Sequence, residues 1–208
     1  DEQDVSGNYE FFVDCQLEDV EADDGGAPIS IALSGTKPGV ASPSARADIR
    51  DAEILVSSIS SITPTEVIIG QKTVPMIAMT LISDSDIASA SITVLNSLLS
   101  FSKFNTGVTK VILLHDKGTV GTFDLFSDTL VRDTSLFTQN GSVATLTGVP
   151  ILEGNNNFIV AIDVGHDVPD AALTLPLIKP QISAISAGSA VRVGANFPLP
   201  ATPTQPTV

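Results

Sequence analysis

Apolar and polar residues alternate over two stretches near the start of the chain. Over residues 9–17 the odd positions are apolar and the even positions are mostly acidic or polar, and the apolar ones are Tyr9, Phe11, Val13, Cys15 and Leu17. A period of two predicts a strand with one apolar and one acidic face, with Cys15 buried. A second alternation, over 29–33, follows an acidic turn at 18–26. The two segments predict a hairpin with a long acidic loop.

Residues 35–47 are rich in Pro, Gly and Ser and predict a loop or linker. Beyond them, short β patterns predict strands over 52–60, 66–69, 74–82, 90–95, 108–115, 129–137, 142–147, 158–164, 172–178 and 191–193. Turn-forming residues separate most of these strands, including Gly and Asn at 154–157. The segments 74–82 and 108–114 are apolar on both faces, which places them in the middle of a sheet.

Many short strands, with no segment of helical period, predict an all-β fold. We expect an antiparallel β-sandwich, immunoglobulin-like or jelly-roll, with an N-terminal hairpin or donor-strand extension. Three parts are expected: an acidic β extension and linker over 1–47, a sandwich domain over 48–196, and a Pro-rich extended tail over 197–208. Because a lone hairpin is not stable by itself, the extension should pack on the main domain or on a neighbouring copy.

Charge narrows the range of partners. The chain has 24 acidic and 10 basic residues and a formal net charge of −14. Nucleic-acid binding requires clustered Lys and Arg, so this balance argues against it, and it also disfavours anionic membrane surfaces. No run of 18 apolar residues predicts a membrane-spanning helix, so no membrane insertion is expected.

Composition also bears on location. Only 16% of the residues are charged and 5% are aromatic, with no Trp and a single Cys. Few charges and abundant Ser, Thr, Val and Ile favour a secreted protein, extracellular or at the cell surface, over a cytosolic enzyme. The first residue is Asp1, which favours a removed leader or an excised segment.

A family resemblance covers about two thirds of the chain, over residues 58–198. Its motifs are SITPTEV at 61–67, VPMIAMTL at 74–81, VILLHD at 111–116, IVAIDV at 159–164 and GANFP at 194–198. These segments resemble the immunoglobulin-like sandwich modules of secreted bacterial and archaeal surface proteins. The resemblance implies a spacer, stalk, adhesive or structural unit.

One acidic loop is a candidate cation site. Residues 116–128 (DKGTVGTFDLFSD) resemble the calcium loops of similar modules. Calcium takes six to eight oxygen ligands, usually from acids at alternate positions with a Gly at the bend. Asp116, Asp124 and Asp128 are the candidate Ca²⁺ ligands, with Gly121 at the bend; an ordinary hairpin loop is the alternative. No other cofactor is expected, although the acidic residues 18–24 could gather calcium at a subunit contact.

Other chemistry-bearing residues are few. His115 and His166 have no evident third ligand for a metal site, and the sequence contains no nucleophile elbow, Cys/His signature or phosphate loop. We therefore expect no enzyme, and a secreted hydrolase is only a third hypothesis. Asn140-Gly141-Ser142 is a sequon, which makes Asn140 a candidate glycosylation site.

Two functions remain. In the first, the chain is a structural subunit of an extracellular filament, pilus-like fibre or surface lattice, in which the strand carrying Tyr9, Phe11, Val13, Cys15 and Leu17 is donated to a neighbouring copy. Its partner is then the chain itself, as a homopolymer. In the second, the chain is a spacer or ligand-binding module, adhesin or accessory domain, of a larger secreted surface protein, and glycans are candidate ligands.

Overall fold

The computed structural model describes residues 29–32, 44–47, 52–97, 107–166, 179–188 and 191–200. The chain divides into two compact units, Asp1–Arg50 and Asp51–Val208. Each unit is treated separately below.

In the N-terminal unit, β1 (Ile29–Ala32) pairs antiparallel with β2 (Ser44–Ala47), and Ile29 lies opposite Ala47. The expectation that 35–47 is wholly a loop or linker is therefore wrong for its last four residues. Within the Pro- and Gly-rich composition, Ala45 and Ala47 alternate with Ser44 and Arg46, and this short period of two suits a strand. The expected strand over 9–17, with all five of its apolar residues, lies outside the described residues.

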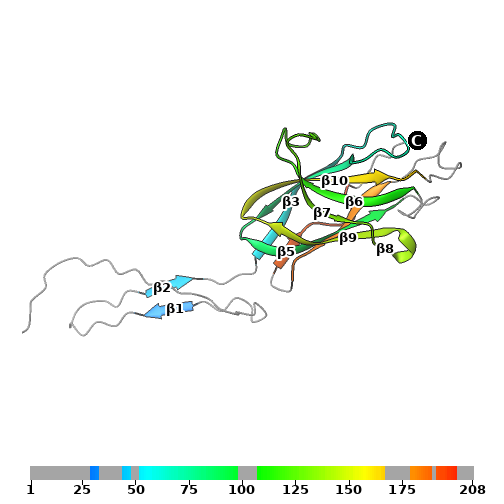
Figure 1. The fold of residues 1–208 in the computed structure, drawn as a ribbon. Helices are drawn as coiled ribbons and strands as arrows, with labels where there is room; N and C mark the ends of the chain where they lie inside the picture. The colour runs from blue at the N-terminus through cyan, green and yellow to red at the C-terminus, as the bar shows by residue number, and fades with distance from the viewer. Residues whose placement is uncertain are drawn as a thin grey trace, which may run out of the picture. The chain divides into compact units, whose positions relative to one another are not determined.

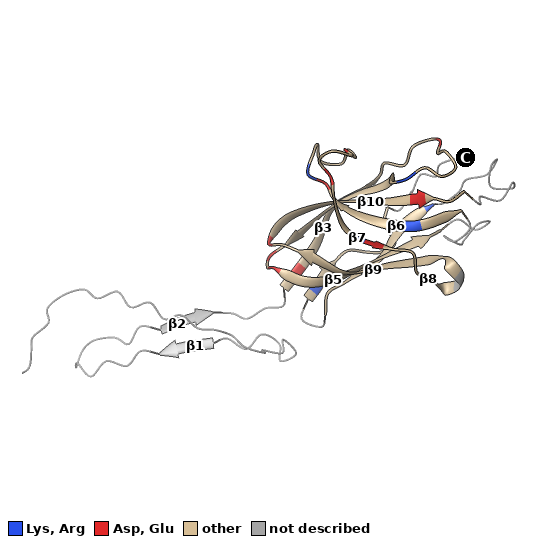
Figure 2. Ribbon diagram, in the orientation of Figure 1, with Lys and Arg blue, Asp and Glu red and all other residues tan. Residues whose placement is uncertain are grey.

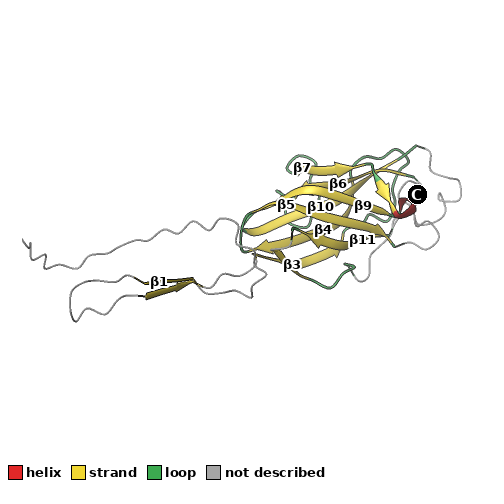
Figure 3. Cartoon of the chain, turned by 90° about the horizontal axis from the view of Figure 1, so that it is seen from below, coloured by secondary structure: helices red, strands yellow, loops and turns green. Residues whose placement is uncertain are grey.

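The second unit is built from two sheets (Figures 1 and 3). The larger contains, in spatial order, β12 (Val191–Gly194), β3 (Ala52–Ser61), β4 (Val74–Ser83), β10 (Gly154–Val164), β6 (Val108–His115) and β7 (Thr129–Thr134). The smaller contains β11 (Pro180–Ser186), β5 (Ile87–Asn96), β9 (Val143–Ile151) and β8 (Phe137–Thr138). All pairs are antiparallel except β12 with β3, which run parallel. This arrangement confirms the predicted all-β sandwich.

The main core lies between the sheets and draws on both of them. Phe158, Val160 and Ile162 of β10 meet residues such as Ile92 and Leu146 of the smaller sheet, all at most 1% exposed. The alternate residues of the three central strands point to the other side of the larger sheet. There they form a second, smaller cluster of Ala78, Ile112, Leu114, Ile159 and Ala161, with Ile62 and Phe123 packed against it. Both predicted two-sided strands, 74–82 and 108–114, are thus confirmed as interior strands.

Three predicted strands differ from the structure. The predicted strand 129–137 is two strands, because the chain leaves the larger sheet after Thr134 and joins the smaller one at Phe137. The segment 66–69 is a loop, in which the Gln71 side chain accepts the Ile68 N–H (2.9 Å) and Gly70 adopts a φ of +79°. The segment 172–178 lies outside the described residues.

Two further differences lie near β10 and β11. The predicted turn at 154–157 is the start of β10, because the Asn156 side chain satisfies the Leu152 backbone N–H (2.9 Å) and carbonyl (2.7 Å) and so moves the turn ahead of the Asn run. Strand β11 was not predicted at all, and it lines the core with Ile182 and Ile185.

The first residues of the Pro-rich tail lie against β11. The backbone groups of Leu199 and Ile182 exchange two hydrogen bonds, and the Gln181 side chain donates to the Pro200 carbonyl at 2.7 Å. Phe197 packs on the main core. The tail therefore occupies part of the edge of β11 that does not pair with β5, while residues 201–208 lie outside the described residues. Across the described ranges, no helix has the length and apolar character that a bilayer crossing demands.

Candidate functional site

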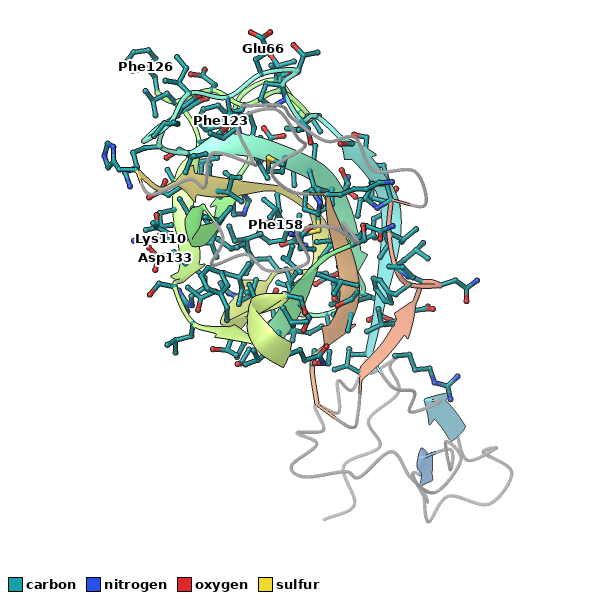
Figure 4. All side chains as sticks on the ribbon, turned by 90° about the vertical axis from the view of Figure 1, so that its right-hand side faces the viewer. Glu66, Lys110, Phe123, Phe126, Asp133 and Phe158 are labelled. Atoms are coloured by element: carbon teal, nitrogen blue, oxygen red, sulfur yellow. The ribbon has the colours of Figure 1, made fainter. Side chains whose placement is uncertain are left out.

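The predicted cation loop connects β6 to β7 and spans Asp116–Asp128. Its base is held by a backbone hydrogen bond from Asp116 N–H to the Asn157 carbonyl of β10 (2.9 Å). Phe123 anchors the loop by packing on the smaller apolar cluster of the larger sheet. Figure 4 shows Phe123 nearer to the sheet, and Phe126 at the outer end of the loop.

All three predicted aspartates accept backbone hydrogen bonds within this loop. Asp116 Oδ2 accepts the Gly121 N–H at 2.6 Å. The two oxygens of Asp128 accept the N–H groups of Lys117 (3.1 Å) and Asp124 (2.8 Å). Asp124 Oδ1 accepts the Phe126 N–H at 2.9 Å. Each carboxylate therefore closes a turn of the loop, as Asp side chains commonly do.

These hydrogen bonds of the carboxylates bear on whether the loop can bind calcium. A calcium site needs several oxygens converging on one point. In the described residues no group of three or more His, Cys, Asp or Glu side chains is arranged to hold a metal ion. The structure brings Asp116, Asp124 and Asp128 into one loop, but it directs them to backbone N–H groups, which supports the hairpin-loop alternative. Calcium binding stays a prediction.

The buried carboxylate of Asp116 retains one free oxygen. Asp116 is only 5% exposed, and its Oδ1 atom has no hydrogen-bond partner. A buried carboxylate oxygen without a partner is costly, commonly by about 1–3 kcal/mol. Asp116 is therefore the position in this loop where a water or a cation would be stabilised most.

The side chain of the neighbouring His115 is half-buried. Its ring lies 5.3 Å from that of Phe158, tilted by 57°, and its Nδ1 atom has no hydrogen-bond partner. Burial lowers the pKa of His115 below 6.5, Lys117 lowers it further, and Asp116 opposes the shift. The neutral imidazole is thus the form that suits this position, and His115 is a packing residue.

Asp124 is held as a carboxylate. The hydrogen bond from the Phe126 N–H lowers the pKa of Asp124 below the usual 3.8. At Gly118, a Cβ would lie 2.6 Å from the Ser127 Oγ atom and 3.4 Å from the Asp124 Cβ. The loop is thus closely packed around these three residues, and its backbone path is well fixed.

The loop presents apolar side chains at its tip. Val120 is 60% exposed, Leu125 69% and Phe126 96%. Sequence reasoning missed these three residues. No local signal in the sequence separates them from Phe123, which lies in the same loop and packs on the larger sheet.

A second loop, between β3 and β4, is also fixed and apolar. Asp163 of β10 accepts the Thr73 N–H at 2.9 Å and pairs with Lys72 at 3.4 Å. The loop exposes Ile68, at 75%. His166 lies over Gly70, where an added Cβ would be 2.4 Å from the His166 ring. The His166 ring therefore packs closely on the backbone of this turn at Gly70.

The structure says less about the remaining predicted site residues. Asn140 lies in η2 (Gln139–Gly141), a 3-10 turn between β8 and β9, where the Ser142 hydroxyl donates to the Gln139 carbonyl at 2.7 Å. The sequon is therefore in a turn, as predicted, and its glycosylation stays a prediction. Tyr9, Phe11, Val13, Cys15 and Leu17 are outside the described residues.

Comparisons with known proteins give little further guidance. No protein-family model and no curated protein matches the chain. Among solved structures, a Hadza microbial sialidase is similar, with 11% sequence identity and a TM-score of 0.45. The alignment covers 74% of this chain and only 30% of the sialidase. A similarity of this degree says nothing about the chemistry of this chain.

Proposed function

We propose that the chain is a non-catalytic structural subunit of an extracellular filament, fibre or surface lattice, built from copies of itself. The observation that supports this best is the tip of the β6–β7 loop, where Val120, Leu125 and Phe126 are exposed to solvent. The resemblance to immunoglobulin-like modules of surface proteins agrees with such a role.

The tip is suited to contact because it is both apolar and fixed. Covering apolar surface is favourable by roughly 25 cal/mol per Å², and this one loop exposes three large apolar side chains, Val120, Leu125 and Phe126. The loop is ordered by the carboxylate bonds of Asp116, Asp124 and Asp128. Little conformational entropy is then lost when a partner binds.

Assembly by strand donation is a more specific version of this proposal. The described sheet edges leave little space for a donated strand to pair. The edge strand β7 carries a register shift together with Arg132 and Asp133, and bulges and charges both discourage edge pairing. The other edges are also blunted, since β8 has 2 residues, β12 has 4, and β11 is partly covered by Leu199. We therefore place the main contact at the loop tip, with donation by residues 9–17 as an additional step.

The experiment is negative-stain electron microscopy of the purified full chain, with sedimentation velocity, before and after calcium chelation. The test variant is Leu125→Ser with Phe126→Ser, and the matched control is Leu152→Ser, which removes a 57% exposed leucine from another turn. We expect fibres or lattices from the parent chain and from the control, and at least a tenfold loss of assembly in the test variant. If the fibres or lattices dissolve when calcium is chelated, calcium binding by the acidic loops would be supported.

Uniform monomers of the parent chain in both conditions would contradict the proposal. That outcome would favour the alternative, a spacer or ligand-binding module of a larger secreted protein, for which glycan binding would be measured next.

A further inference from the structure

The two loops with exposed apolar residues lie at opposite ends of the larger sheet. Strand β6 ends at His115, opposite Phe158 in the first half of β10, whereas β4 begins at Val74, opposite Ile162 near the end of β10. The β6–β7 loop therefore leaves the sheet at one end, called the tip end below, and the β3–β4 loop (residues 62–73) leaves it at the other, called the opposite end.

The tip end is strongly acidic (Figure 2). Besides the three aspartates of the loop, it carries acids on the neighbouring turns, where Asp84 accepts the Glu53 N–H at 2.8 Å and Asp86 accepts the Glu153 N–H at 2.7 Å. Of the ten acidic residues that the structure describes in the second unit, seven lie here: Glu53, Asp84, Asp86, Asp116, Asp124, Asp128 and Glu153. The described bases at this end are Lys117 and Arg192, which leaves a formal charge of −5.

The opposite end is electrically balanced (Figure 2). Its described charged residues are three acids and three bases: Glu66, Asp133, Asp163, Lys72, Lys110 and Lys179. Lys110 pairs with Asp133 at 2.8 Å, and Lys72, which is 62% exposed, pairs with Asp163 at 3.4 Å. The described part of the sandwich is thus polar along its strands, with an acidic end and an end that offers lysines.

The β3–β4 loop at the opposite end shares two properties with the β6–β7 tip. It exposes large apolar side chains, since Ile68 is 75% and Ile69 38% exposed. Its backbone is also fixed, because the Gly70 N–H donates to the Gly165 carbonyl at 3.2 Å and the Gln71 side chain accepts the Ile68 N–H at 2.9 Å. A fixed loop loses little conformational entropy when a partner binds.

Charge decides which surface can receive the tip. Two tip ends facing each other would bring two groups of seven acidic residues together, and like charges across a contact disfavour it. The opposite end repels an acidic partner far less, because its lysines balance its acids, and Lys72 there is exposed. It also supplies apolar side chains to cover those of the tip.

We infer that the β6–β7 loop tip of one copy binds the β3–β4 loop of a second copy, so that copies join head to tail. This inference rests on the proposed self-assembly and names the surface that receives the tip. Val120, Leu125 and Phe126 of one copy are then covered by Ile68 and Ile69 of the next. Each added copy leaves one tip and one β3–β4 loop free, so the contact extends into an open fibre, or into a ring if the rotation between copies closes.

The test uses two full-length variants that each lose one side of the contact. The tip variant is Leu125→Ser with Phe126→Ser, and the receiving variant is Ile68→Ser with Ile69→Ser. The control is Leu152→Ser, which removes an exposed leucine from the β9–β10 turn. Sedimentation velocity is run on each protein alone and on an equimolar mixture of the tip and receiving variants, and thermal melting checks that each variant folds.

We expect the parent and the control to assemble, and the Kd for self-association of each double variant to rise at least tenfold with an unchanged melting temperature. The mixture should form a complex of one tip variant and one receiving variant that grows no further, because an intact tip then meets an intact β3–β4 loop once only.

Three results would overturn the inference. If the receiving variant assembles as the parent does, the tip binds another surface, while self-assembly through the tip stands. If both variants fail to assemble and their mixture forms no paired complex, the two loops do not bind each other. If the parent chain is monomeric throughout, the proposed self-assembly fails together with this inference.

Discussion

At the residue scale, Asp116 differs from the other two aspartates of its loop. Asp128 uses both carboxylate oxygens on backbone N–H groups, whereas Asp116 uses one and buries the other. The position of all three in one loop follows from their spacing in the sequence. Their role does not, because an Asp-rich loop can bind a cation or close its own turns, and the path of the backbone decides between the two.

Asp116→Asn tests whether a cation occupies this position. The amide oxygen can still accept the Gly121 N–H, while the buried negative charge is removed, so we expect stability to be unchanged or higher. Asp116→Ala removes the acceptor and should cost about 1–3 kcal/mol. The measurement is urea unfolding with calcium and with chelator. An Asn variant that is destabilised only when calcium is present would contradict this expectation and establish a bound cation.

His115 predicts a pH dependence of stability. Its pKa is lower in the folded chain than the ordinary 6.5, so the unfolded state takes up a proton first as pH falls. The contribution of His115 is therefore constant above pH 6.5 and becomes increasingly unfavourable below it, until the folded form is also protonated. His115→Gln should remove this component, and His166→Gln serves as the control at an exposed position. Unfolding free energies measured at several pH values check it, and parallel curves for His115→Gln and the parent would contradict it.

At the element scale, alternation and two-sided apolar runs predicted the strands that build the core. Strand β6 begins and ends as predicted, and β3 and β4 each extend one residue further. The predictions from sequence were wrong in two situations. In one, a side chain takes the place of a backbone hydrogen-bond partner, and in the other the chain passes from one sheet to the other. Asn156 moves the turn ahead of β10, and the step from β7 to β8 cannot be seen in a continuous β pattern.

The exposed tip of the β6–β7 loop could not be predicted from local sequence. Phe123 and Phe126 are three residues apart in one loop, yet Phe123 packs on the larger sheet and Phe126 is 96% exposed. Which of them is covered depends on the outer face of β4, β10 and β6. That face becomes available only after those strands have paired.

At the scale of the whole molecule, the second unit contains its own core and both sheets. All described contacts of the main core come from residues after Asp51. We therefore expect residues 51–208, expressed alone, to fold with the melting temperature of the full chain. Circular dichroism and thermal melting check this, and an unfolded fragment would contradict it.

The same fragment separates the modes of assembly. If contacts run through the loop tip, residues 51–208 should still associate in sedimentation. If association is lost in this fragment, and also on deletion of residues 1–20 from the full chain, strand donation by residues 9–17 is the dominant contact instead.

The parallel pairing of β12 with β3 has a mechanical consequence. The first described strand of the unit lies beside the last described one, with Ala52 opposite Val191 and Leu55 opposite Gly194. Tension applied through the two ends of the unit pulls these strands in opposite directions along their own length. The hydrogen bonds between them are then loaded in shear and must break together, whereas bonds pulled open from one end break one by one. A subunit tethered at both ends would thus resist stretching where β3 pairs with β12.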